Sequence, residues 1–169
     1  SCQIIGSVFV GSSSVAISAV QRSTVDMSDS FINRVSGAGI LVHSFSVLKG
    51  KNIRISETDK AGFIVYDGNA EISRSSITNC SNSGCEILSS SSLELNEVWI
   101  SETKGSAILV DQSKIKLTRC RVTNASKHGI EVLNSASAKI SDTMIDTNTY
   151  SGILSVSGKI ELQSCHIEG

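Results

Sequence analysis

The residues best suited to chemistry are scattered along this sequence. Cleavage of a glycosidic bond takes two carboxyl groups, one on each side of the scissile bond, but the chain has no Asp-Asp pair and no visible cluster of aspartates. Calcium-assisted proton abstraction needs several acidic residues and a base, and the nearest acidic pair, Asp142 and Asp146, is expected on different parts of one structural repeat. His43, His128 and His166 are expected in different repeats, which argues against a zinc triad. The sequence therefore predicts a non-catalytic protein with no metal site and no cofactor.

The cysteines suggest a reducing environment. Their positions, Cys2, Cys80, Cys85, Cys120 and Cys165, fit neither a CxxC metal-binding spacing nor a dense disulfide framework. We expect free thiols that pack as small apolar residues, which favours a cytoplasmic location. One or two disulfides in a secreted protein are the alternative.

The overall charge is almost balanced. The 15 basic and 16 acidic residues give a net charge of −1 and are spread along the chain, so no strong field attracts nucleic acid or anionic lipid. No apolar run approaches the ~20 residues that span a bilayer. Neither nucleic acid nor a membrane is an expected partner. The chain has 169 residues, and we expect residues 1–169 to form a single domain that is a fragment of a larger protein.

An internal repeat indicates the elements that position these residues. A Gly or Ala followed by an apolar-x-apolar triplet recurs at intervals of 23, 22, 23, 22 and 23 residues. The successive copies are Gly39-Ile40-Leu41-Val42, Gly62-Phe63-Ile64-Val65, Gly84-Cys85-Glu86-Ile87, Ala107-Ile108-Leu109-Val110, Gly129-Ile130-Glu131-Val132 and Gly152-Ile153-Leu154-Ser155. Such a constant period is typical of a repeat architecture.

Each repeat contains two further short alternating segments, so three short strands fit in each turn. Period-two alternation places the flanking residues of each triplet inside and the middle residue outside. The sequence therefore predicts an all-β parallel β-helix, a solenoid of about seven turns of 22–23 residues, whose turns are stacked about 4.8 Å apart. Ile108 and Ile130 are then expected in adjacent layers. The alternation is unclear at residues 45–51, and we expect a bulge or loop in the turn at 39–61.

Two outward rows have contrasting character. The first-strand row is largely aliphatic, which favours cover by a partner, another domain or a crossing loop over scattered exposure. It contains Leu41, Ile64, Glu86, Leu109, Glu131 and Leu154. The second-strand row is charged and is interpreted as a solvated face. It contains Asp26, Glu71, Glu94, Lys116, Lys139 and Glu161, with one turn unassigned.

The third-strand row is the predicted binding face. It contains Phe31, Arg54, Ser76, Trp99, Arg121, Met144 and His166. Trp and Arg dominate contact energies at protein interfaces, and an exposed Trp flanked by arginines also suits stacking on a sugar ring. The alternative is a surface cation–π pair between Trp99 and Arg121.

The pattern Gly-Ile-x-Val, a polar turn, Ala/Leu-x-Ile/Leu and Ser/Cys-x-Ile/Val ending at Asn79 or Asn124 resembles the pectin-lyase-like superfamily over residues 14–169. In style it is similar to the CASH-type repeats found in carbohydrate-binding proteins and sugar hydrolases, in F-box-only adaptors and in the Shc SH2-domain-binding protein. The resemblance implies a right-handed parallel β-helix. It also implies recognition of a protein or a glycan.

We expect a non-catalytic scaffold that binds another protein, or a flanking domain of the same protein, through the first-strand and third-strand rows. A carbohydrate-binding or polysaccharide-cleaving domain is the alternative, and an extracellular adhesin or fibre segment is a second one. Because the last turns of a β-helix expose unpaired backbone groups, we also expect end-to-end or side-by-side self-association.

Overall fold

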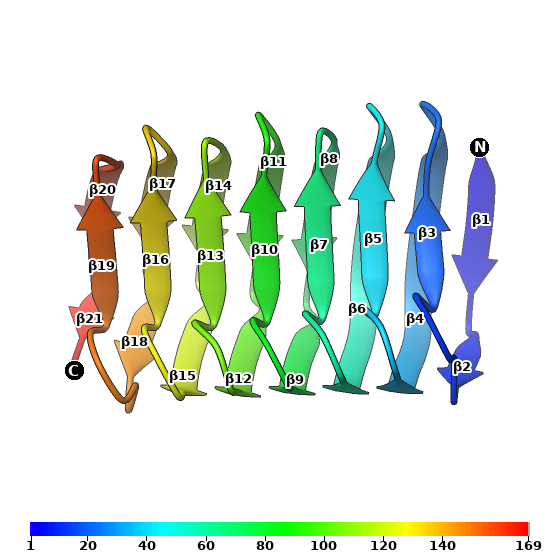
Figure 1. The fold of residues 1–169 in the computed structure, drawn as a ribbon, viewed down its shortest axis with the longest axis horizontal. Coiled ribbons are helices and arrows are strands. Elements are labelled where there is room, and N and C mark those ends of the chain that lie inside the picture. Colours follow the sequence, from blue (N-terminus) through cyan, green and yellow to red (C-terminus); the bar gives the residue numbers. More distant parts are fainter. Residues whose placement is uncertain (169) are drawn as a thin grey trace.

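The computed structural model describes residues 1–168 as a coil of parallel strands, with about seven turns and no helix in this range (Figure 1). One seven-stranded sheet contains the first strand of each turn. Its members are β3 (Ile17–Ala19), β5 (Ile40–His43), β7 (Phe63–Tyr66), β10 (Cys85–Leu88), β13 (Ile108–Asp111), β16 (Ile130–Leu133) and β19 (Ile153–Val156). No helix in residues 1–168 is long and apolar enough to cross a membrane.

A 14-stranded sheet contains the second and third strands of each turn. The second strands are β1 (Cys2–Ile5), β8 (Asn69–Ser73), β11 (Ser92–Asn96), β14 (Lys114–Thr118), β17 (Ser137–Ser141) and β20 (Lys159–Gln163). The third strands are β2 (Val8–Val10), β9 (Ser76–Cys80), β12 (Trp99–Thr103), β15 (Arg121–Ala125), β18 (Met144–Asp146) and β21 (His166–Ile167). Two longer strands, β4 (Thr24–Val35) and β6 (Val47–Thr58), supply both positions in their turns.

The predicted register is confirmed. Ile108 pairs with Ile130 in parallel strands, and both side chains are fully buried. The alternation of the strands produces inward ladders, because residues that point inward in one turn lie directly against their equivalents in the next. One such ladder contains Ile40, Phe63, Cys85, Ile108 and Ile130, each at most 1% exposed. Stacking of turns on one another therefore provides the core.

The bulge expected at residues 45–51 is wrong. Strand β6 is unbroken, and Val47–Lys51 pairs residue by residue with Asn69–Ser73. The alternation looked irregular because Gly50 occupies an inward position whose neighbours are Met27 and Ile72. A Cβ atom on Gly50 would lie 2.6 Å from the Cδ1 atoms of both Ile53 and Ile72, so those two side chains already fill the space.

The corners explain the two repeat lengths. Each turn bends where residues adopt a left-handed backbone, as at Ser44, Asn52 and Glu57 (φ 56°, 54° and 54°). In a repeat of 23 residues the corner between the first and the second strand has two such residues, for example Ser89 and Ser90 (φ 56° and 61°). In a repeat of 22 residues it has one, such as Gln112 (φ 50°). The extra residue is therefore absorbed in this corner and leaves the register of the strands unchanged.

Buried hydroxyl groups satisfy backbone donors at the same corner. The amide of Gly68 donates to Ser91 Oγ at 3.2 Å, and the amide of Ser91 donates to Ser113 Oγ at 3.1 Å. Ser91 Oγ in turn donates to the carbonyl of Leu88 at 2.5 Å. Because an unpaired buried amide is costly, these serines are structural residues of the solenoid.

Candidate functional site

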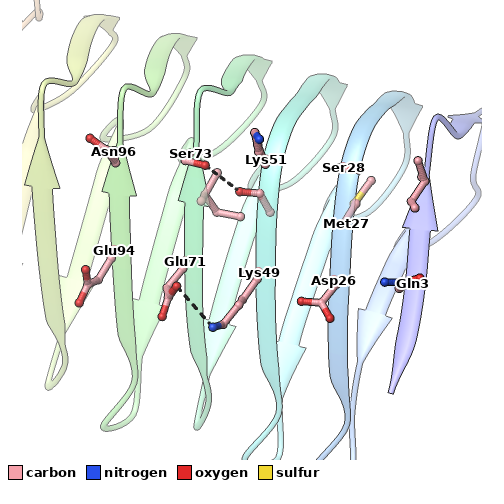
Figure 2. A pocket seen from close by; sticks show the side chains of 13 residues that line it. Gln3, Asp26, Met27, Ser28, Lys49, Lys51, Glu71, Ser73, Glu94 and Asn96 are labelled. Atoms are coloured by element: carbon pink, nitrogen blue, oxygen red, sulfur yellow. Dashed lines mark hydrogen bonds and ion pairs between the residues drawn. The ribbon is translucent and has the colours of Figure 1, made fainter.

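A groove crosses the second strands on the outside of the coil (Figure 2). It has a volume of about 490 Å³. One side is formed by Gln3, Asp26, Lys49, Glu71 and Glu94, and the other by Ser28, Lys51, Ser73 and Asn96 together with Ile5, the strand partner of Ser28. Residues Met27, Gly50 and Ile72 form the floor between the two sides. We call this feature the polar groove.

The alternation of the strands creates the polar groove. Lys49 and Lys51 point outward from β6, while Gly50 between them points inward, and β4, β8 and β11 repeat this arrangement in register. The groove therefore runs at right angles to the strands, along the axis of the coil. A smaller hollow of about 270 Å³ begins at Glu94 and Asn96 and continues past Lys116 to Arg119. Together the hollows extend over six successive turns, or roughly 24 Å at the usual strand spacing.

The ion pairs in the groove are open to solvent. Lys49 Nζ lies 3.9 Å from Glu71 Oε2, and Lys116 Nζ lies 3.4 Å from Glu94 Oε2, with all four side chains more than half exposed. Exposed pairs of this kind contribute at most ~1 kcal/mol. A ligand can therefore replace one member of such a pair at small cost.

Lys51 has no ion-pair partner within 4.0 Å among residues 1–168. Its charge acts on Asp29, which lies at the corner that follows in the neighbouring turn. The side chain of Asn52 donates to Asp29 Oδ1 at 2.8 Å and lowers the pKa of Asp29, and the charges of Lys51 and Arg74 lower that pKa further. Lys51 is therefore a cation available to a ligand in the groove.

The second-strand row was interpreted from the sequence as a solvated face with one turn unassigned. Lys49 occupies that turn, between Asp26 and Glu71. The row is exposed as expected, but its members from Asp26 to Glu94 form one side of a groove. A signal for the groove was present in the sequence, because the next outward position is also polar in successive turns, at Ser28, Lys51, Ser73 and Asn96.

The third-strand row lies in the predicted register. Phe31, Arg54, Ser76, Trp99, Arg121, Met144 and His166 are consecutive partners in the ladder. Trp99 is 47% exposed and Met144 is 39% exposed. Arg121 Nη2 lies 3.7 Å from Asp146 Oδ2. Within residues 1–168 the cation–π contact joins Arg22 and Phe45, at 6.0 Å, so the suggested pair between Trp99 and Arg121 is not formed.

The first-strand row also lies in the predicted register. Leu41, Ile64, Glu86, Leu109, Glu131 and Leu154 are consecutive partners. All six are half-buried. The other outward row of these strands is also largely apolar, and it includes Leu88 and Leu133.

The titratable residues considered for catalysis remain apart from the polar groove. The His128 ring lies 5.6 Å from the Tyr150 ring, and the amide of Ser151 donates to His128 Nδ1 at 3.3 Å. His128 is therefore a turn residue beside the first strands. In residues 1–168 no three His, Cys, Asp or Glu side chains are grouped so that they could hold a metal ion.

All five cysteines are free thiols. Burial raises the pKa of Cys80, Cys85 and Cys120, and the increase is largest for Cys85, which belongs to the inward ladder. Neutral buried thiols of this kind are packing residues.

The coil of parallel turns defines the class of protein. The chain matches the family described as "Right handed beta helix region" over residues 15–169. It therefore belongs to the right-handed β-helix family, and the right-handed fold expected from the sequence is confirmed. No curated protein matches the sequence.

Solved structures with this fold include enzymes that act on alginate. The A-module of the Azotobacter vinelandii mannuronan C-5 epimerase AlgE4 superposes with a TM-score of 0.82 at 10% identity, over 99% of this chain and 56% of that chain. The periplasmic alginate epimerase AlgG superposes with a TM-score of 0.77 at 14% identity, over 97% of this chain and 50% of that one. The chain thus spans about half the length of these structures, and at such identities the likeness concerns the fold alone.

Proposed function

We propose that this β-helix binds a linear polysaccharide along the polar groove. The observation that carries the proposal is the direction of the groove, which follows the coil axis across successive turns. The turns repeat every ~4.8 Å, a step similar to the length of one sugar unit in an extended chain. Successive sugars would therefore meet equivalent positions of successive turns.

The side chains of the groove suit sugar hydroxyl and carboxylate groups. Carboxylates such as Asp26 and Glu94 accept hydrogen bonds, lysines donate them, and Ser73 and Asn96 do both. Lys51 offers a positive charge for an acidic sugar. AlgE4 and AlgG, which have the same fold, are named for action on mannuronan and alginate, both linear acidic polymers. This likeness supports a linear acidic polysaccharide as the ligand class.

We propose binding without cleavage. Glu71 and Glu94, two carboxylates of the groove, each lie beside a lysine of a neighbouring turn. These two carboxylates are engaged by lysines, whereas glycosidic cleavage takes two carboxyl groups, one on each side of the scissile bond. Incubation of the protein with mannuronan should therefore leave the polymer's length and its C-5 configuration unchanged, as measured by size-exclusion chromatography and proton NMR.

The binding experiment compares Lys51→Ala/Asn96→Ala with Lys139→Ala. Lys139 is the matched control, because it is an exposed lysine of the same sheet face that does not line the groove. Calorimetric titration with mannuronan oligomers should show at least about tenfold weaker binding for the groove variant, which is ~1.4 kcal/mol. Equal affinities of the groove variant and wild type would overturn the proposal, and so would the absence of binding to every acidic and neutral polysaccharide tested.

Recognition of a protein by the third-strand row is the second candidate. The observation that favours it is the exposed sequence Trp99, Arg121 and Met144 across three neighbouring turns, since Trp and Arg are the residues that most often dominate interface energies. Affinity capture should lose its specific partner with Trp99→Ala/Arg121→Ala. Loss of polysaccharide binding in the same variant would instead assign this row to the sugar.

A further inference from the structure

The outer face of the seven-stranded sheet is apolar over most of its length. Two outward rows contribute to it. Its apolar members are Leu41, Ile64, Leu109 and Leu154 in one row, and Tyr66, Leu88, Leu133 and Val156 in the other. Tyr66 is 50% exposed and Val156 is 52% exposed. We call this surface the aliphatic face. A largely apolar exposed surface of this kind marks an interaction site.

The two rows contain three carboxylates and one histidine, His43, but no Lys or Arg. Glu86 and Glu131 flank Leu109, one turn away on either side, and Asp111 lies in the neighbouring row. No cation lies within 4.0 Å of these three carboxylates among residues 1–168. The aliphatic face therefore presents negative charge within apolar surface, which is complementary to a partner with apolar and basic side chains.

The two glutamates are held in place. Asn82 Nδ2 donates to Glu86 Oε1 at 2.7 Å, and Ser106 Oγ donates to Glu131 Oε2 at 2.7 Å. Burial raises the pKa of Glu86, so part of its hydration is already lost in the free protein. Oriented and partly desolvated carboxylates lose less freedom when a cation binds them.

An α-helix suits this face better than an extended segment. The inner strands β5, β7, β10, β13 and β16 are hydrogen-bonded on both sides, so the face offers side chains but no free backbone groups. A covering segment must therefore satisfy its own backbone, as a helix does. The helical pitch of about 5.4 Å is close to the turn spacing of about 4.8 Å, so a helix parallel to the coil axis can place one apolar side chain against each turn.

The spacing of the carboxylates determines where a covering helix would need its basic residues. Glu86 and Glu131 are two turns apart, or about 9.6 Å. On a helix, residues seven positions apart are about 10.5 Å apart on one face. The rows from Leu41 to Leu154 extend over five turn spacings, about 24 Å, which corresponds to a helix of about 16 residues.

From these observations we infer that the aliphatic face binds an amphipathic α-helix of a partner protein, with an aliphatic stripe and two basic residues seven positions apart that pair with Glu86 and Glu131. This inference goes beyond polysaccharide binding and does not depend on it, because the polar groove lies on the other sheet.

The test uses three synthetic 18-residue peptides with the same aliphatic stripe and the same helical content. One has Lys at i and i+7 on the stripe, one has Glu at these positions, and one has the same lysines at i and i+4. Fluorescence anisotropy should show at least about tenfold tighter binding of the first peptide than of either other peptide. Similar affinities for all three would overturn the inference.

Charge reversal provides the matched protein variant. Glu86→Lys/Glu131→Lys should prefer the Glu peptide over the i, i+7 Lys peptide, and Glu86→Gln/Glu131→Gln should bind the two equally. Both variants are checked by circular dichroism, and the Gln variant serves if the Lys variant does not fold. An unchanged preference in the folded variant would disprove the pairing. Lys51→Ala/Asn96→Ala should bind the Lys peptide like wild type, which separates this test from that of the groove.

Discussion

The amide of Ser90 donates a hydrogen bond of 3.0 Å to the carbonyl of Gln112 in the next turn. Ser90 is the second left-handed residue of a corner with two, whereas Gln112 is the one left-handed residue of its corner. Corners of both lengths therefore stack on one another within the same solenoid. The strands on either side remain in register, with Ser92 paired to Lys114.

This relationship predicts that deletion of Ser90 is tolerated. The deletion converts a 23-residue repeat into a 22-residue repeat of the kind already present, so the protein should unfold cooperatively with a loss of no more than ~2 kcal/mol. Deletion of Glu94 is the matched comparison, because it shifts a strand by one residue and turns its inward side chains outward. Urea unfolding followed by circular dichroism distinguishes the two. Equal damage from both deletions would contradict the role assigned to the corner.

Ile108 is expected to be a large contributor to stability. It is fully buried between Cys85 and Ile130, and Ile108→Ala should reduce the free energy of unfolding by ~2–5 kcal/mol because a cavity remains in the ladder. The exposed Lys116→Ala should change it by less than ~0.5 kcal/mol. Chemical denaturation at fixed pH measures both. A small effect at Ile108 would mean that the neighbouring turns collapse into the space.

Ser91→Ala is expected to cost ~1–3 kcal/mol, because the buried amide of Gly68 loses its acceptor. The control is Ser92→Ala, since the hydroxyl of Ser92 bonds the exposed side chain of Asn69 at 2.8 Å. Thermal unfolding compares the two variants. If their unfolding temperatures coincide, a water molecule or a shifted backbone satisfies the Gly68 amide.

The buried thiols predict a loss of stability at alkaline pH. The pKa of Cys85 in the folded chain lies well above 9.0, because burial disfavours the thiolate. The unfolded chain therefore releases this proton at lower pH than the folded chain does, and stability decreases as pH rises through about 9. The contribution of Cys85 is roughly 1 kcal/mol per pH unit there. Urea midpoints between pH 8 and 10 should decrease less steeply in Cys85→Val than in wild type, whereas parallel slopes would exclude this thiol.

Thiol labelling gives an independent measurement of burial. Cys2 is exposed and should react with a small disulfide reagent within seconds, while Cys80, Cys85 and Cys120 should react only as fast as the protein unfolds. Single-cysteine variants assign each rate. Rapid labelling of Cys85 in the folded protein would show that the turns separate easily.

The sequence by itself determined the period, the three strands in each turn and the identity of the stacked residues. The physical reason is that every turn buries the same inward positions against its neighbours, so the requirement for an apolar side chain recurs at the repeat length. The members of the outward rows through Trp99 and Leu109 could also be predicted from the sequence. In an alternating strand, a residue between two inward residues must point outward. Gly50 broke this pattern, and the sequence prediction failed there because the side chains of Ile53 and Ile72 fill the space that an apolar side chain at this inward position would occupy.

Only the tertiary structure decided how the outward rows combine into surfaces. The depth of the polar groove depends on how far the side chains of two outward rows extend above the backbone between them. A single row in the sequence contains no information on that depth. The half-buried state of Leu109 likewise arises from the side chains beside it on the folded sheet, and the pairing of Arg121 with Asp146 depends on which neighbour lies within reach. Side-chain direction is a local property that the sequence pattern records, whereas exposure and charge pairing depend on residues that come together only when the chain has coiled.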